Sequence, residues 1–245
     1  MRILFLGYEK NIIIDFLKKE NDVTICKDKI DAEMVKDFDY VISYGYTHIL
    51  KKDVLDACKL GIINLHISFL PWNRGFYPNF WSFVKDTKKG VTIHFMDEGI
   101  DTGDILFQKE VKFNNEQTLE ETYHRLREEI ECLFIDNWAN IISGNYVRRK
   151  QEKKGSFHLK KELEKFKLSN PWKIKIKELK AMTKRTDLEI IDEVENIRTK
   201  NNVNWMDILR LAFKHAPSDA RKLMAKVNEH DGRISELLSE LAENG

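Results

Sequence analysis

The sequence has few cysteines, and their spacing suits neither metal binding nor disulfide pairing. Cys26, Cys58 and Cys132 are an odd number of thiols that form no CxxC pair and no Cys/His ligand pattern. Disulfides persist in oxidising compartments, and scattered single thiols are typical of reducing ones. We therefore expect a cytoplasmic protein with reduced, structural cysteines.

Long hydrophobic runs and an excess of either charge are also missing. No apolar run approaches the roughly 20 residues of a membrane span, and the opening MRILFLG is too short for the apolar part of a signal peptide. The 245 residues carry 41 Lys plus Arg and 40 Asp plus Glu, a formal net charge of +1. Such a balance gives no general attraction to nucleic acid, although a local basic patch is still allowed. We expect a soluble globular protein that binds neither nucleic acid nor membrane.

Short apolar runs rich in β-branched residues alternate with helical patterns in the first half of the chain. Continuous apolar strands between helices predict a mostly parallel sheet with both faces covered, that is, an α/β fold. Gly7 ends the first strand alone and forms no GxGxxG turn, which makes a dinucleotide site a weak interpretation. The expected strands are residues 2–6, 22–26, 40–45 and 61–66, and the expected helices between them include 10–19 and 51–60.

A different pattern begins at residue 90. The segments 90–97 and 104–113 are strand-like and are separated by EGIDTG, which predicts two adjacent strands with a shaped loop. Thr118 and Glu121 form the capping-box pattern of a long helix, and Gly144 is suited to end it.

The chain divides into three predicted parts. Residues 1–150 form the α/β core, residues 151–185 form a basic connector, and residues 186–245 form a small C-terminal α-helical module. In that module we expect Asn204 to cap a helix, and we expect helix breaks near Pro217 and Gly232. Because the module lacks clustered catalytic residue types, we interpret it as a packing or oligomerisation unit of a homodimer.

One strand, GIINLH at residues 61–66, ends in polar side chains and leads into a stiff, aromatic-rich loop. Asn64 and His66 are two residues apart and point to the same side of the strand. At the carboxyl end of a central parallel strand they would lie where ligands gather. Both can donate hydrogen bonds to an oxyanion during acyl transfer, and the imidazole can also move a proton. The alternative is a core histidine beside a capping asparagine.

The loop DEGIDTGD supplies a carboxylate that could act with this histidine. Asp101 beside an imidazole would stabilise the imidazolium and fix the orientation of the ring. A divalent metal held by His66, His94, Asp97 and Asp101 is a second interpretation. Because no HxH or HExxH pattern supports it, we predict no metal.

Two segments together resemble one family, the folate-dependent formyltransferases. NLHISFLPWNRG and GVTIHFMDEGIDTGDIL match its Asn-x-His strand-loop and its Asp loop in order and separation, and the resemblance covers roughly residues 1–158. The extended LPWNRGFYPNFWS looks most like the branch that formylates nucleotide-linked amino sugars, and like the related formylation domains of peptide synthetases. Ile67 stands where many members have proline. The resemblance implies a Rossmann-like formyltransferase core.

The resemblance also implies roles for particular residues. Asn64, His66 and Asp101 correspond to the catalytic triad, and 10-formyltetrahydrofolate is the implied donor. Lys154 or His158 could meet nucleotide phosphates. The implied folate contacts are Tyr46, His48, Leu50, Met96, Asp97 and Gly99. The expected acceptor contacts are Trp72, Asn73, Arg74, Tyr77, Asn79 and Trp81, with the alternative that Phe80 and Trp81 only begin a core helix.

The predicted reaction is therefore formyl transfer from 10-formyltetrahydrofolate to the amine of a nucleotide-linked amino sugar, as in surface-glycan synthesis. A methionyl-tRNA formyltransferase is an alternative, disfavoured because residues 186–245 look helical and balanced in charge, not β-rich and basic. A glycinamide ribonucleotide enzyme is disfavoured by the missing glycine-rich turn near Gly7. The third alternative is a folate- or sugar-binding module without turnover.

Overall fold

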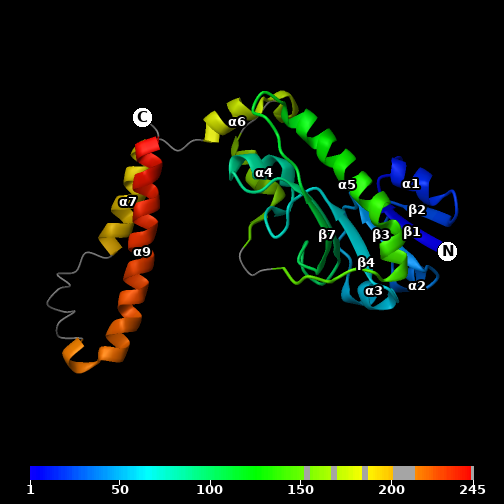
Figure 1. Ribbon diagram of the computed structural model, residues 1–245, viewed down its shortest axis with the longest axis horizontal. Coiled ribbons are helices and arrows are strands. Elements are labelled where there is room, and N and C mark those ends of the chain that lie inside the picture. Colours follow the sequence, from blue (N-terminus) through cyan, green and yellow to red (C-terminus); the bar gives the residue numbers. More distant parts are fainter. Residues whose placement is uncertain (152–154, 167–169, 184–186, 201–212, 244–245) are drawn as a thin grey trace. The chain divides into compact units, whose positions relative to one another are not determined.

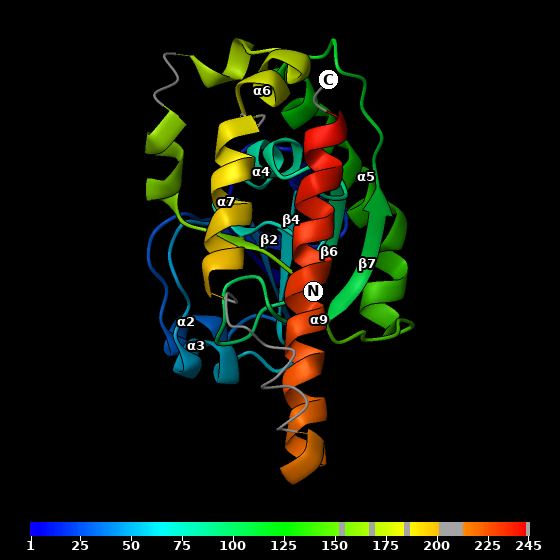
Figure 2. The same cartoon turned by 90° about the vertical axis from the view of Figure 1, so that its left-hand side faces the viewer.

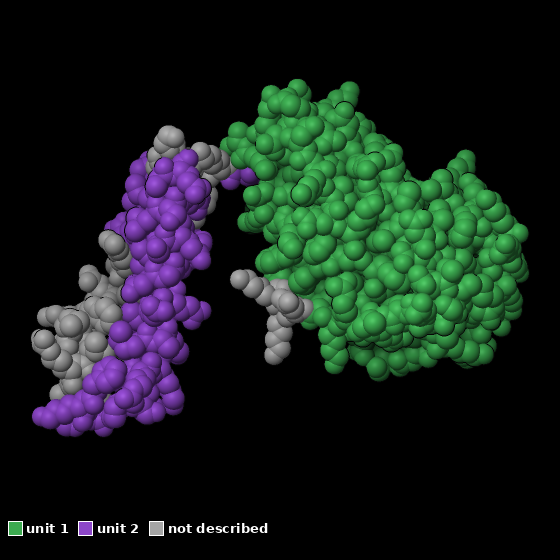
Figure 3. All heavy atoms as spheres, in the orientation of Figure 1, with its two compact units in different colours: residues 1–182 green, residues 183–245 purple. Residues whose placement is uncertain are grey.

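The computed structural model describes residues 1–151, 155–166, 170–183, 187–200 and 213–243 (Figure 1). The chain forms two compact units, Met1–Met182 and Thr183–Gly245 (Figure 3). Each unit is described by itself.

The described part of the first unit is built on a six-stranded sheet of order β2-β1-β3-β4-β6-β7. Neighbouring strands from β2 to β4 are parallel, and the pairs β4–β6 and β6–β7 are antiparallel. The mostly parallel sheet is therefore confirmed, with β4 near its centre. The strands are β1 (Arg2–Gly7), β2 (Asp22–Cys26), β3 (Tyr40–Tyr44), β4 (Ile62–His66), β6 (Gly90–Phe95) and β7 (Ile105–Glu110).

Helices cover both faces of this sheet, as the continuous apolar strands predict. On one face α1 (Ile12–Leu17) and α5 (Leu119–Ser143) share a core with the odd-numbered apolar residues of β1 and β4. On the other face α2 (Ala32–Val35) and α3 (Lys52–Ala57) share a second core with the alternate residues. The helix α5 lies beside β7 in both views (Figure 1 and Figure 2). Every residue of β3 is buried as a result.

The predicted capping box is present at the start of α5. The Thr118 hydroxyl accepts from the Glu121 backbone N–H at 3.2 Å, and the Glu121 carboxylate accepts from the Thr118 N–H at 2.6 Å. The helix ends at Gly144, whose φ of +70° is left-handed.

Described residues between 155 and 182 contact the core in two places, although the charge of this segment predicts a solvated connector. The two-residue strands β5 (Arg74–Gly75) and β8 (Phe157–His158) pair in parallel. Two 3₁₀-helical segments, Lys160–Phe166 and Pro171–Lys173, then lead to α6 (Ile176–Thr183). Ile176 and Leu179 of α6 are buried against α4 (Pro78–Val84). Lysines dominate the composition of this segment, but Ile176 and Leu179 are three residues apart and therefore lie on one apolar face of the helix.

The second unit contains α7 (Asp187–Lys200) and α9 (Pro217–Glu243), which pack against each other. Apolar side chains of both helices are buried between them, including Ile190 and Leu237. Pro217 begins α9 as expected, but the predicted break at Gly232 is wrong because α9 continues through it. Asn204 lies outside the described residues. No described helix combines the length and apolar character that a bilayer crossing requires.

Candidate active site

Asn64 and His66 lie at the carboxyl end of β4 and meet the carboxylate of Asp101. The amide nitrogen of Asn64 donates to Oδ1 of Asp101 at 3.2 Å. Nδ1 of His66 lies 3.7 Å from the same oxygen. His66 and the Asp101 carboxylate are both close to fully buried. The two sequence segments predicted to act together are therefore adjacent in space.

A fourth side chain, His94, joins this group. Strand β6 pairs with β4 in the register Asn64 to His94, which places both residues on the same sheet face. Nε2 of His94 lies 3.1 Å from Nδ2 of Asn64 and 3.6 Å from Oδ1 of Asp101. Nδ1 of His94 lies 2.7 Å from the carbonyl oxygen of Phe95, which can only accept, so Nδ1 carries the proton and Nε2 accepts from Asn64. The sequence pattern had suggested His94 only as a metal ligand.

The group is not arranged around a cation. Across the described ranges of the chain, no three His, Cys, Asp or Glu side chains are grouped so that they could hold a metal ion. The Asn64 amide instead hydrogen-bonds both His94 and Asp101. This arrangement suits hydrogen bonding and proton transfer.

The backbone around Asp101 holds its carboxylate in place. Oδ2 of Asp101 accepts from the backbone N–H of Gly75 at 2.9 Å, which ties the Asp loop to β5. Asp101 itself has a φ of +54°, a left-handed conformation that is costly for a residue with a side chain. Asn73 and Tyr77, on the loop that follows β4, share this feature with φ of +56° each. Backbone strain is thus concentrated at the two loops that meet at the carboxylate.

The surroundings set the protonation of the His66 and Asp101 pair. Burial lowers the pKa of His66 below its ordinary value, and the nearby Asp101 carboxylate opposes this effect. Burial acts to raise the pKa of Asp101, but the charges of protonated His66 and His94 and the hydrogen bond from the Gly75 N–H outweigh it and hold that pKa well below its usual range. At neutral pH the pair consists of a neutral imidazole next to an ionised carboxylate.

The two loops predicted to contact folate lie against the same part of the core. Tyr46, Leu50 and Met96 all pack on the cluster between the sheet and α2–α3. A salt bridge of 2.6 Å between Lys52 Nζ and Glu98 Oε1 links the first residue of α3 to the Asp loop at the surface. The Leu50 side chain is buried, so that only its backbone could meet a ligand.

Other polar groups in these two loops already have hydrogen-bond partners, either within their own loop or in the segment after β2. The Tyr46 hydroxyl donates to the carbonyl of Asp28 at 2.7 Å, and the Tyr46 ring lies 5.3 Å from that of His48. Oδ1 of Asp97 accepts from the backbone N–H of Gly99 at 3.1 Å and from the Thr102 hydroxyl. These contacts leave backbone groups of the loops as the main candidates for ligand binding.

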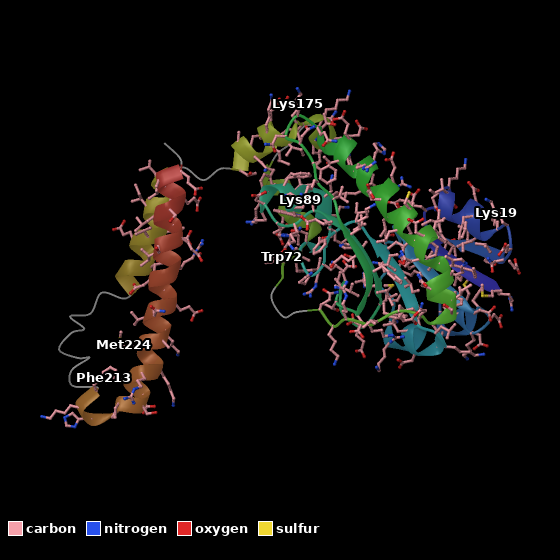
Figure 4. All side chains as sticks on the ribbon, viewed as in Figure 1. Lys19, Trp72, Lys89, Lys175, Phe213 and Met224 are labelled. Carbon is pink, nitrogen blue, oxygen red and sulfur yellow. The ribbon has the colours of Figure 1, made fainter. Side chains whose placement is uncertain are left out.

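Part of the predicted acceptor segment is accessible. The Trp72 side chain, labelled in Figure 4, and that of Arg74 are half-buried. Tyr77 is 38% exposed, and its neighbour Phe76, which the sequence pattern did not single out, is 46% exposed. The exposed Phe157 of β8 pairs in register with Arg74. Arg74 is thus close to exposed aromatic residues in the chain and in the β5–β8 pairing, and its guanidinium is hydrogen-bonded to Gln151.

Two predicted acceptor residues, Asn73 and Asn79, lie inside the protein. Asn73 is 0% exposed, and its amide bonds the hydroxyls of Thr87 and Ser156 at 2.7 and 3.2 Å. Asn79 is 4% exposed and donates to the Thr122 hydroxyl at 3.1 Å. The structure corrects the prediction for both, because buried amides that pair with internal groups cannot reach a bound molecule.

Trp81 is the third correction. It is 4% exposed and stacks on the ring of His158 with centroids 4.2 Å apart, within the α4 core. The alternative that Phe80 and Trp81 begin a core helix is correct. His158 is buried, with Nδ1 3.2 Å from Glu162 Oε2, which does not suit the suggested phosphate contact. Lys154 lies outside the described residues.

Comparisons with known proteins agree on one chemistry. The family described as "Formyl transferase" matches residues 18–137. The methionyl-tRNA formyltransferase of Clostridium tetani is 30% identical over 207 residues, 77% of this chain and 66% of the relative. The dTDP-4-amino-4,6-dideoxyglucose formyltransferase of Mycobacterium tuberculosis is 30% identical over 133 residues, 54% of this chain and 56% of the relative. The chain thus spans less than two thirds of the length of these curated relatives.

A solved structure matches more completely. The formyltransferase PseJ from Anoxybacillus kamchatkensis, in complex with UDP-4,6-dideoxy-4-formamido-L-AltNAc and tetrahydrofolate, is 43% identical with a TM-score of 0.70. The match covers 73% of this chain and 97% of that one.

Proposed function

Because this chain belongs to the formyltransferase family, we propose that it transfers a formyl group from 10-formyltetrahydrofolate to the amino group of a nucleotide-linked amino sugar. The observation that carries this proposal is the similarity to PseJ, whose structure holds tetrahydrofolate and a formamido sugar linked to UDP. Those two molecules are what remains when a formyl group has moved from 10-formyltetrahydrofolate to a sugar amine.

The geometry at β4 supports this chemistry. In the proposed reaction the neutral amine attacks the formyl carbon, a new C–N bond forms, and the carbonyl oxygen becomes an oxyanion. In this proposal one N–H of the Asn64 amide exchanges its hydrogen bond with Oδ1 of Asp101 for one with that oxygen. The low-dielectric surroundings of the buried site strengthen this interaction.

His66 manages the proton in this proposal. Its lowered pKa leaves the imidazole neutral and able to accept the proton from the attacking amine. The imidazolium that forms is stabilised by Asp101, whose Oδ1 lies 3.7 Å from Nδ1. Collapse of the intermediate breaks the bond between the formyl carbon and N10 of the folate, and His66 returns the proton to N10. A water held by Asp101 is the competing acceptor of the amine proton.

The folate is proposed to lie against the two loops that share the α2–α3 core. Backbone groups of Tyr46, His48 and Leu50 on one side, and of Met96, Asp97 and Gly99 on the other, are suited to a flat polar ring because the side chains are buried or paired locally. No metal is part of the proposal.

The nucleotide-linked sugar is proposed to enter past Trp72, Arg74 and Tyr77. The guanidinium of Arg74 can pair with a phosphate through two N–H groups, and exposed aromatic faces can stack on a base or sugar. Phe76 joins this set because of its exposure next to Tyr77.

We further propose that the enzyme acts in the cytoplasm as a homodimer and that its product is used in glycan biosynthesis. Neither nucleic acid nor membrane is a partner in this proposal. The three free thiols support the cytoplasmic location. The near-neutral net charge supports a protein that has no nucleic acid partner. The second unit supports dimerisation in this proposal.

A methionyl-tRNA formyltransferase is the second candidate, favoured by the similarity to the Clostridium tetani enzyme. One assay separates the candidates: the full chain is incubated with 10-formyltetrahydrofolate and either methionyl-tRNA or a panel of uridine-, thymidine- and cytidine-linked amino sugars, and products are followed by mass. We expect formylation of a sugar and none of the tRNA.

Three results would change this conclusion. Formylation of methionyl-tRNA alone would replace the sugar by the tRNA. Tight folate binding without turnover of any acceptor would favour the non-catalytic module. Turnover by a His66→Gln variant equal to that of the wild type would show that the imidazole takes no part in the reaction. Asn145→Ala, on the exposed turn after α5, is the control variant for this measurement.

A further inference from the structure

The side-chain amide of Gln151 connects the two loops that meet at the candidate active site. Its Oε1 accepts from Nε and Nη2 of Arg74 at 3.0 and 2.7 Å. Its Nε2 donates to the carbonyl oxygens of Asp101 and Gly103, both at 2.8 Å. One side chain thus makes four hydrogen bonds, two to the β5 side and two to the Asp loop.

Glutamine fits this position because of the order of donors and acceptors. A guanidinium can only donate and a backbone carbonyl can only accept, so the amide has one productive orientation. A glutamate of the same shape would still pair with Arg74, but it would place a charged oxygen against two carbonyl oxygens. A methionine would fill the space and lose all four bonds.

The carbonyls that Gln151 holds lie on either side of a tight turn. Asp101 has a φ of +54°, and a side chain added at Gly103 would come within 1.9 Å of the Phe95 carbonyl oxygen. Such a conformation persists only when surrounding contacts over-determine it. Gln151 supplies two of these contacts, and the Gly75 N–H supplies another through the Asp101 carboxylate.

The same bonds fix Arg74 relative to Asp101. Arg74 precedes Gly75, whose N–H contacts Oδ2 of Asp101, so the β5 strand is tied to the Asp loop at two points. The guanidinium therefore cannot swing away without breaking its contact to the residue that holds the Asp101 turn.

We propose that Gln151 is a positioning residue that sets the distance between an anionic group of the acceptor at Arg74 and the Asp101 carboxylate next to His66. The part that concerns the acceptor rests on the proposed function. The part that concerns the Asp101 turn does not, since it follows from hydrogen bonds within the chain.

The decisive experiment is an NMR titration of His66 in the full chain without substrate, comparing wild type with Gln151→Met. The groups that face His66 are Asp101, His94 and the carbonyl of Asn73. Because the Asp101 charge acts to raise the His66 pKa against burial, release of the Asp101 turn lowers the titration midpoint of His66. The control is Gln117→Met, at the remote turn before α5, which removes the hydrogen bond that Gln117 accepts from the Asn114 N–H. We expect it to leave the titration midpoint of His66 unchanged.

Kinetics of formyl transfer provide a second readout. We expect Gln151→Met to lower kcat/KM for the acceptor by roughly 10- to 100-fold, since a displacement of about 1 Å in a reacting group costs up to 10²-fold. Gln151→Glu, which keeps the shape and the Arg74 contact, is expected not to restore kcat. If the methionine variant fails to fold, Gln151→Asn serves in both measurements, because its shorter amide cannot span the two loops.

The outcomes separate the two proposals. A lowered His66 midpoint in an enzyme that formylates no sugar supports the positioning role and removes the proposed acceptor. An unchanged midpoint and an unchanged kcat in a folded Gln151 variant overturn the positioning role, whatever the wild type formylates. Full recovery of kcat by Gln151→Glu also overturns it, because the two hydrogen bonds to the carbonyl oxygens of Asp101 and Gly103 would then not be needed.

Discussion

The amide nitrogen of Asn64 lies 3.2 Å from Oδ1 of Asp101, although 37 residues separate them in the sequence. Strand β6 pairs antiparallel with β4 and aligns His94 with Asn64, and the loop that follows β6 carries Asp101 to this contact. His66 and His94 complete the group around the same oxygen.

Replacement of the carboxylate should slow the reaction more than it weakens binding. Asp101→Asn keeps the shape of the side chain and removes its charge, so the imidazolium formed in the reaction loses its stabilising partner. We expect kcat to fall by roughly 10²- to 10⁴-fold, the range of general acid–base effects. Steady-state kinetics measure this. Asp136→Asn, exposed on α5, should behave as wild type, and an unchanged kcat in Asp101→Asn would remove the carboxylate from the mechanism.

The protonation of His66 should depend on Asp101 in a defined direction. Burial disfavours the imidazolium, so the free enzyme should bind a proton at His66 only below the ordinary value of about 6.5. Removal of the Asp101 charge takes away the opposing contribution, so the midpoint in Asp101→Asn should lie lower still. NMR titration of the histidine rings measures both, with His66→Gln for assignment. A midpoint above 6.5 in the wild type would contradict the neutral resting imidazole.

The accessible and buried aromatic residues of the loop after β4 should differ in their effect on the acceptor. Tyr77→Ala removes an exposed ring and should raise KM for the sugar nucleotide roughly tenfold, as for loss of one stacking contact. Trp81→Phe changes the buried stack on His158 and should lower thermal stability while KM stays the same. Kinetics and thermal unfolding distinguish the two variants. A raised KM in Trp81→Phe alone would restore Trp81 to the acceptor site.

A polar network under α5 should contribute to stability independently of the chemistry. Glu131 accepts from the Tyr44 hydroxyl at 3.0 Å and from Arg127 at 3.3 Å, and the Glu131 side chain is 10% exposed. Removal of the Glu131 carboxylate leaves the Tyr44 hydroxyl and Arg127 without this acceptor, so Glu131→Leu should lower the free energy of unfolding by about 2–3 kcal/mol. Arg127→Met combined with Glu131→Leu should recover part of that loss. Denaturant unfolding measures the cycle, and additive effects of the two changes would argue against coupling.

The second unit should support assembly and not chemistry. A chain that ends at Lys184 keeps the whole first unit, Met1–Met182, with its sheet and site residues. We expect it to retain turnover and to show a smaller oligomer in solution than the full chain, measured by light scattering. A soluble truncated chain of unchanged oligomeric state without turnover would show that the second unit takes part in the reaction.

Much of the fold follows from patterns that act over short distances. The β-branched runs, the capping box at Thr118 and the side-by-side placement of Asn64 and His66 depend on neighbours within a few residues, and they were predictable. Short-range patterns also placed Asp101 in a turn. His94 could have been found from the pairing of β4 with β6, which aligns it with Asn64.

Other features depend on which way a side chain turns in an irregular segment. Asn79 and Trp81 have the residue types of a binding loop, but they begin α4 and face the core. The lysine-rich composition of residues 151–185 predicts a connector, while Ile176 and Leu179 of α6 pack in the same cluster as residues of α4. Gln151 carries no local signal, since its partners Arg74 and Asp101 lie far away in the sequence.

The pairing of β5 with β8 also bears on how the protein is made. Arg74 and Phe157 are partners, so the loop after β4 is held by a strand that leaves the ribosome long after the sheet itself. The Ser156 hydroxyl accepts from the Asn73 backbone N–H and donates to Oδ1 of Asn73, and both bonds span 83 residues. Closing so long a loop is a late and slow event in folding. In chain order the residues of the six-stranded sheet and of both site histidines therefore precede residues 155–158, whose contacts hold the loop after β4.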